Sequence, residues 1–313
     1  MAYRRFQNTV AESRVTLPLI AVLALGSAVV SGLVSGQWWV QLLCVTLSVY
    51  LMIELSRRHQ LLRVHSQMVP GAMLLLLTAL SVLISDLRFA ILCLCLTSFY
   101  SAFFRCYQRR QSSGWIYFGF LSLSLASMVF VQILYFVPFL WGAMAFNLYA
   151  LNMRSWAASL LALLTPYWFT LAWMMCQGDV SWMAEHWSGL FAFAPLGCFE
   201  RLTQHQWVNM GYVALLALVG IVHYRRQSYS DKIRTRMLYE VFILIDLFTL
   251  LFLAMQPQHY APLMAMAVVS TAPLLAHFIA LTHTWLTNIA FYLIILLTLT
   301  VSYYNLWMPS LNF

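Results

Sequence analysis

Residues 223–255 read HYRRQSYSDKIRTRMLYEVFILIDLFTLLFLAM, a basic tract followed directly by a long apolar run. Asp246 is the only charged residue between Val241 and Met255. The apolar run 238–255 has about the 17–25 residues that a helix needs to cross a bilayer. Lys and Arg in a short flanking loop hold that loop on the cytoplasmic side. The stretch therefore predicts a membrane-spanning helix that starts from an inside loop.

The same alternation of basic clusters and apolar runs extends over the whole chain. Apolar residues make up 63% of the 313 residues and charged residues 8%, against roughly 25% charged in soluble domains. We therefore expect an all-α, polytopic transmembrane bundle in one domain, 1–313. Fifteen of the seventeen Lys and Arg residues fall in five clusters: Arg4, Arg5 and Arg14; Arg57, Arg58 and Arg63; Arg105, Arg109 and Arg110; Arg154; and Arg225, Arg226, Lys232, Arg234 and Arg236.

This placement of charge also argues against nucleic acid as a partner. The formal net charge is +8, but the positive residues lie in membrane-flanking loops rather than on one basic face. The partners expected are membrane lipids and an inner-membrane protein.

The apolar runs predict about eleven spans, with the N-terminus inside and the C-terminus outside. An inside segment at 1–15, an outer loop at 177–207 and a basic inside loop at 224–237 complete the chain. No polar turn divides the run 115–152. Arg110 before it and Arg154 after it should lie on the same side of the membrane, so the chain must cross an even number of times between them. We therefore expect two helices with a turn near Tyr135–Pro138. The expected spans are 16–35, 38–55, 69–85, 88–104, 115–132, 135–152, 156–176, 208–223, 238–255, 261–280 and 287–307.

Motifs of soluble enzymes and metal sites are absent from the sequence. There is no P-loop, GxGxxG, GxSxG or HExxH motif and no Cys/His set with zinc spacing. We therefore expect no metal and no cofactor. The absence of catalytic motifs also favours a protein that is not an enzyme. Cys176 and Cys198 both fall on the predicted outer side, where they could form a disulfide if that side is oxidising.

Polar residues inside the predicted spans are the first candidates for a substrate or proton site. Asp246 lies about 12 Å into its span at 1.5 Å per residue, and a lone buried carboxylate there needs a partner or a function. The structural alternative is a hydrogen bond between helices, to His277 or Asn147. The full candidate set is Asp246, His277, Asn147, Thr165 and Ser270.

Two further groups of candidates lie outside the spans. The outer loop contains Asp179, Glu185, His186 and Arg201 among aromatic residues, a composition typical of the headgroup level of a membrane. In the basic inside loop, Lys232, Arg236 and Glu240 are spaced by four residues and would line one helix face as a docking surface, or would be solvated anchors.

Four segments resemble a family of multispanning bacterial inner-membrane proteins to which no activity is assigned. They are SYSDKIRTRMLYE at 228–240, QPQHY at 256–260, TAPLLAHFIALTH at 271–283 and YNLWMPSL at 304–311. The resemblance implies a multi-pass protein of the bacterial inner membrane. It carries over no functional residues.

Three classes of function fit these features. The first is a transporter or flippase for a small or lipid-linked substrate, favoured by Asp246 and by two spans interrupted by proline, one at Pro166 and one at Pro262 and Pro273. The second is a non-catalytic subunit of an inner-membrane envelope complex. The third is a transferase that uses a polyprenyl-linked donor at the outer face, with the outer loop as its site.

Overall fold

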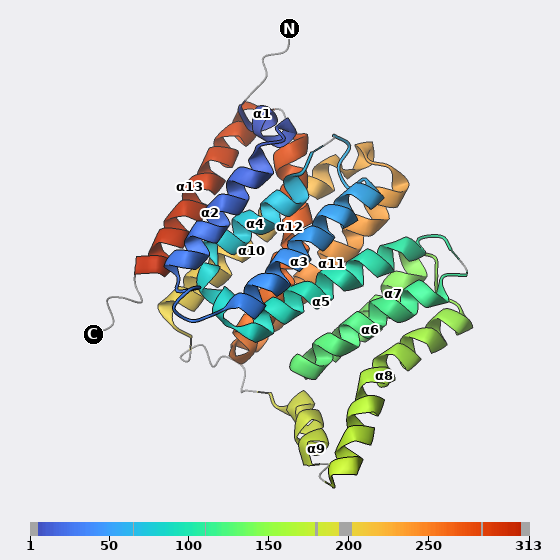
Figure 1. The fold of residues 1–313 in the computed structure, drawn as a ribbon. Helices are drawn as coiled ribbons and strands as arrows, with labels where there is room; N and C mark the ends of the chain where they lie inside the picture. Colours follow the sequence, from blue (N-terminus) through green and yellow to red (C-terminus); the bar gives the residue numbers. More distant parts are fainter. Residues whose placement is uncertain are drawn as a thin grey trace.

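The computed structural model describes residues 6–64, 66–109, 111–178, 181–193, 202–282 and 284–307, and these form helices and connecting turns without a strand. Short 3₁₀ segments join several of the helices. The α-helices, shown in Figure 1, are α1 (Phe6–Glu12), α2 (Thr16–Val30), α3 (Trp39–His59), α4 (Met68–Ala79), α5 (Leu87–Phe103), α6 (Ser113–Val129), α7 (Val137–Phe146), α8 (Met153–Gln177), α9 (Ser181–Ser188), α10 (Gln204–Gln227), α11 (Ile233–Met255), α12 (Tyr260–Leu281) and α13 (Trp285–Trp307). The expected all-α class is confirmed.

Helix α12 is the centre of the bundle. Apart from Ala261, every residue from Tyr260 to Leu281 is buried, and the helix contacts α4, α5, α10 and α11 (Figure 1). A helix that is apolar on all sides is typical of a core position. The side chains that α12 presents to its neighbours therefore lie out of contact with the surroundings of the molecule.

Among the described residues, seven helical segments are long and apolar enough to cross a membrane, and an eighth is added if the bent pair α1–α2 is one span. This count is lower than the eleven predicted. Helices α4, α6 and α7 have 12, 17 and 10 residues, whereas a hydrocarbon core about 30 Å thick needs about 20. The sequence predicted these apolar segments but not how short their helices are.

The undivided apolar run 115–152 does form two helical segments, but the break lies earlier than predicted. Phe130 adopts an extended conformation (φ −141°, ψ 91°) and ends α6. A 3₁₀ segment, Val131–Phe136, then leads into α7. The predicted turn at Tyr135–Pro138 is therefore wrong by several residues, because no polar residue marks the break at Phe130.

Helix α1 crosses the end of the bundle where α13 begins (Figure 1). It makes an angle of 89° with α2. The Gln7 side-chain amide donates to the backbone oxygen of Ile279 at 2.8 Å and to the Thr282 hydroxyl, and Asn288 accepts from the Gln7 backbone at 3.4 Å. These bonds connect the first described residues to the last two helices.

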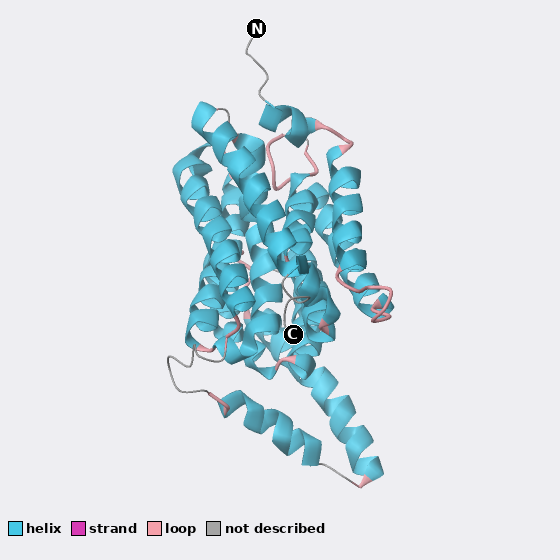
Figure 2. Ribbon diagram, turned by 90° about the vertical axis from the view of Figure 1, so that its left-hand side faces the viewer, coloured by secondary structure: helices cyan, strands magenta, loops and turns pink. Residues whose placement is uncertain are grey.

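Helices α8 and α9 form the periphery of the molecule. Figures 1 and 2 show α8 packed beside α6 and extending past the bundle, with α9 following it. Several large apolar side chains of α8 are exposed, including Trp168, Phe169 and Trp173. Exposed apolar faces of this kind are expected on helices that contact lipid.

Candidate functional site

The predicted intramembrane residue Asp246 lies in the core between α11 and α12. Its side chain is fully buried, and Oδ1 accepts a hydrogen bond from the Thr271 hydroxyl at 3.0 Å. Oδ2 is buried as well and has no hydrogen-bond partner among the described residues. The partner of Asp246 is therefore Thr271, and neither His277 nor Asn147 takes the role suggested by the sequence.

His277 belongs to a different polar group, nearer the end of α12. Its Nε2 atom lies 2.9 Å from Oδ2 of Asp231, while Nδ1 is buried without a hydrogen-bond partner among the described residues. Thr271 precedes His277 by six residues, which is about 9 Å along a helix at 1.5 Å per residue. Asp246 and His277 thus occupy two levels of the core.

The other predicted intramembrane residues pair separately. Asn147 donates from Nδ2 to Oε2 of Glu240 at 2.7 Å, a bond that joins the end of α7 to α11. Ser270 bonds to the Tyr100 hydroxyl at 2.9 Å. The Thr165 hydroxyl bonds to Tyr117 at 3.0 Å and to the backbone oxygen of Leu161 at 2.6 Å. The structure does not gather the five candidates into one site.

On the predicted outer side, the described candidates are Glu185 and His186 on α9. Glu185 is exposed. His186 stacks on Trp182 with ring centroids 4.7 Å apart, and its Nε2 lies 3.3 Å from the Tyr167 hydroxyl. Burial lowers the pKa of His186 below its ordinary value of 6.5. The contacts of His186 thus hold α9 against α8.

Three of the remaining outer-side predictions lie outside the described residues: Asp179, Cys198 and Arg201. Cys176 is exposed at the end of α8. Its pairing with Cys198 stays a prediction.

The predicted inside docking residues lie at the start of α11. Lys232 is exposed directly before the helix, and its Nζ lies 3.5 Å from Oε1 of Gln60. Arg236 is half-buried, and its backbone oxygen accepts from the Tyr224 hydroxyl at 3.3 Å. Because Glu240 bonds to Asn147, its carboxylate takes part in helix packing.

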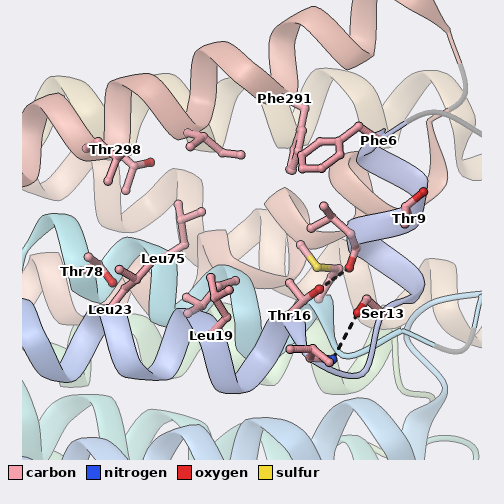
Figure 3. A pocket seen from close by; sticks show the side chains of 16 residues that line it. Phe6, Thr9, Ser13, Thr16, Leu19, Leu23, Leu75, Thr78, Phe291 and Thr298 are labelled. Atoms are coloured by element: carbon pink, nitrogen blue, oxygen red, sulfur yellow. Dashed lines mark hydrogen bonds between the residues drawn. The ribbon is translucent and has the colours of Figure 1, made fainter.

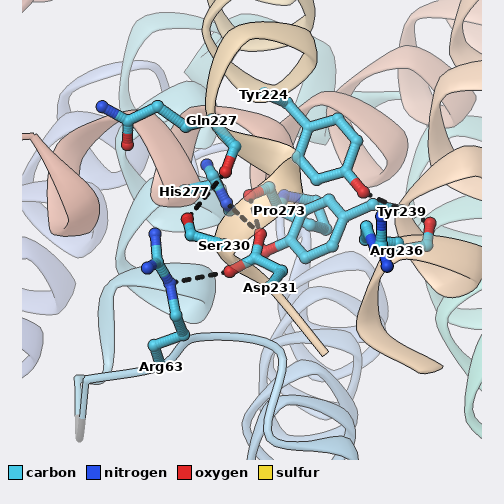
Figure 4. Close-up of polar contacts among 9 residues, drawn as sticks. All are labelled: Arg63, Tyr224, Gln227, Ser230, Asp231, Arg236, Tyr239, Pro273 and His277. Atoms are coloured by element: carbon cyan, nitrogen blue, oxygen red, sulfur yellow. Dashed lines mark hydrogen bonds and ion pairs between the residues drawn. The ribbon is translucent and has the colours of Figure 1, made fainter. Parts of the chain in front are cut away.

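A further polar group surrounds Asp231, a residue that the sequence did not single out. Asp231, in the turn between α10 and α11, forms an ion pair with Arg63, whose Nε lies 2.7 Å from Oδ1, and contacts His277 through Oδ2 (Figure 4). Its side chain is 1% exposed, that of His277 is 0% and that of Arg63 is 39%. The three residues form a buried acid with one half-exposed cation on its outer edge, here called the Asp231 triad.

Aromatic rings enclose the inner end of the triad. Tyr224 and Tyr239 stack with centroids 4.8 Å apart, and both present edge-to-face contacts to His277 at 5.1 and 5.2 Å (Figure 4). The ring of His223 also lies beside His277, with the two ring centroids 5.4 Å apart. Buried ion pairs lose much of their solvation, so they persist only where their geometry is well satisfied. The rings fix that geometry.

Asp231 was missed because it lies in the most basic tract of the chain, where a single acidic residue is expected to be a solvent-exposed surface charge. The signal that could have found it is this isolation: one carboxylate among the five cations of residues 225–236. Asp231 can be buried only because Arg63, which lies in the loop between α3 and α4 and is distant in the sequence, pairs with it.

A basic pocket opens beside the triad. It has a volume of about 1010 Å³ and is formed by the turn after α1, the end of α3, the 60–67 loop and the start of α11. One acidic residue, Glu12, lines it. Its four basic lining residues are Arg14, Arg57, Arg63 and Lys232.

Backbone dipoles add to the positive charge of this basic pocket. Lys232 and Thr235 lie in the first turn of α11 or directly before it. A helix N-terminus carries partial positive charge from its free N–H groups. The chemistry that the pocket favours is therefore the binding of an anion such as a phosphate group.

No protein-family model, curated protein or solved structure matches the chain.

Proposed function

We propose that this protein is a transporter or flippase of the bacterial inner membrane for an anionic small or lipid-linked substrate, which it takes up at the basic pocket. The observation that carries the proposal is the pocket itself, with four cations against one acid. A cavity of about 1010 Å³ at one end of an apolar bundle suits a substrate larger than an ion.

The position of the Asp231 triad supports the same function. Arg63 belongs both to the pocket wall and to the ion pair with Asp231. An anion bound in the pocket would compete with Asp231 for the guanidinium of Arg63. Release of Asp231 would leave a carboxylate that is 1% exposed beside His277, a state that a change of helix packing would relieve. Substrate binding is in this way linked to the central helix α12.

The proposed orientation places the basic pocket inside, with the N-terminus inside and the C-terminus outside, as the distribution of Lys and Arg predicts. Helix α1 contacts the first turns of α13 through Asn288 and Tyr292, so Trp307 is at the opposite end of the bundle. Opposite ends for the two terminal helices are consistent with an odd number of crossings, such as the eleven predicted.

The test is lipid movement in proteoliposomes that contain fluorescent NBD-phosphatidylglycerol, with dithionite added to destroy the dye in the outer leaflet only. We expect faster loss of the inner-leaflet dye than in protein-free vesicles. Arg57→Gln with Lys232→Gln should slow this loss, whereas Arg226→Gln, exposed and outside the pocket lining, should not. Equal rates with and without protein would overturn the proposal of a flippase for a lipid-linked substrate.

A further inference from the structure

A second cavity, of about 420 Å³, lies between α1, α2, α4 and α13 (Figure 3). It is here called the apolar groove. Its long wall is made by aliphatic and aromatic side chains: Phe6, Leu19, Leu23, Leu75, Phe291 and Leu299. Leu19 and Leu23 are exposed on α2, so the groove is open along the surface of the bundle.

Three of the five hydroxyl-bearing residues that line the apolar groove donate to backbone carbonyl groups. Thr16 donates to Val10 at 2.6 Å, Thr78 to Leu74 at 2.8 Å, and Thr298 to Ile294 at 2.7 Å. A polar ligand would therefore find few free hydrogen-bonding groups there. The groove favours a hydrocarbon chain, whose burial is driven by the removal of apolar surface from water.

The apolar groove and the basic pocket meet at the turn between α1 and α2. Ser13 lines both cavities, and Gln67 of the pocket directly precedes Met68 of the groove. The Ser13 hydroxyl accepts from the backbone N–H of Val15 at 3.2 Å, which holds the turn (Figure 3). Because α1 and α2 make an angle of 89°, the chain changes direction sharply at the turn where the two cavities meet.

We propose that the two cavities form one site for an anionic lipid, with its phosphate headgroup in the basic pocket and one acyl chain in the apolar groove. This inference rests on the proposed function and names the class of its substrate. Charge selects the headgroup, since four cations line the pocket. Apolar surface selects the chain. A free phosphate compound would use only the first half of the site, and an uncharged lipid only the second.

Binding of three probes to the full-length, delipidated protein, measured by native mass spectrometry, tests this assignment. The probes are palmitoyl lysophosphatidic acid, glycerol 3-phosphate and monopalmitoylglycerol. We expect the first to bind at least about tenfold more tightly than the other two, which corresponds to about 1.4 kcal/mol. Equal binding of monopalmitoylglycerol would show an unselective lipid surface and overturn the inference.

Variants separate the two halves of the site. Leu23→Trp should fill the groove and weaken lysophosphatidic acid binding about tenfold while glycerol 3-phosphate is unaffected. Leu25→Trp, exposed on the same helix but not in the groove lining, is the matched control. Arg57→Gln with Lys232→Gln should weaken both phosphate probes, in contrast to Arg226→Gln.

The outcomes also distinguish this inference from the proposed function. If Leu23→Trp leaves lipid binding unchanged while the pocket variants reduce it, the groove has no part in the site and the anion pocket stands. If neither phosphate probe binds, the pocket assignment fails, and the inference fails with it.

Discussion

The imidazole of His277 lies 2.9 Å from the carboxylate of Asp231, and neither side chain is more than 1% exposed. The two residues are 46 positions apart, one on the central helix and the other in the basic turn between α10 and α11. This contact connects the charged end of the molecule with its core.

Asp231→Ala should lower the free energy of unfolding by about 1–3 kcal/mol, because the buried Nε2 of His277 loses its hydrogen-bond partner. Arg63→Ala should cost less, since the Arg63 side chain is 39% exposed and keeps contact with solvent. Chemical unfolding of both variants in detergent gives the comparison. Equal losses would show that the burial of Asp231 is not what makes the pair important.

Asp246→Asn should leave folding nearly unchanged but abolish lipid movement in the dithionite assay. The asparagine oxygen can still accept from Thr271, while the group that can take up and release a proton is lost. As a structural comparison, Thr271→Val should destabilise the protein by about 1–3 kcal/mol, because a buried carboxylate oxygen loses its donor. Normal lipid movement by Asp246→Asn would assign Asp246 to helix packing alone.

Gly220→Ala should destabilise the protein by about 1–3 kcal/mol through overpacking. A Cβ at this position of α10 would lie 2.9 Å from the backbone carbonyl carbon of Leu274 on α12. Gly211→Ala on the same helix has no atom within 4 Å of its Cβ and should be neutral or slightly stabilising. Thermal unfolding of the two variants measures the difference, and similar behaviour would mean that α10 and α12 can separate at little cost.

Acidification should weaken the attachment of α9 to α8. Because burial lowers the pKa of His186 in the folded protein, the detached helix takes up a proton first as the pH falls below about 6.5. The stabilisation by neutral His186 is thus present above pH 6.5 and is lost as the pH falls through the lowered pKa. A fluorescence titration on a variant that retains only Trp182 and Trp187 as tryptophans should follow this change, and His186→Gln should remove it.

The sequence predicted the helical class because every apolar run has the length and composition of a helix in a membrane protein. It could not predict the length of α4 or α7, since helix ends such as the one at Phe130 arise from packing and are not marked by a polar residue. Asp246 and His277 were found because they interrupt apolar runs. Their partners were not found, because the contacts with Thr271 and Asp231 depend on how α11, α12 and the 228–232 turn come together.

The basic pocket shows the same limit. Arg57, Arg63 and Lys232 were visible as topology signals, but 175 positions separate Arg57 from Lys232 along the chain. Spacing along one helix predicts a shared face, whereas convergence of separate loops requires the fold.

The hydrogen bonds from Gln7 to Ile279 and Thr282 have a consequence for biosynthesis. A ribosome makes α1 well before α12 and α13, so the bonds of Gln7 cannot form while α1 is being inserted. They form only after α12 and α13 have been translated. The wall shared by α1, α2 and α13 is thus completed late, and a truncated chain that lacks α13 would leave it open.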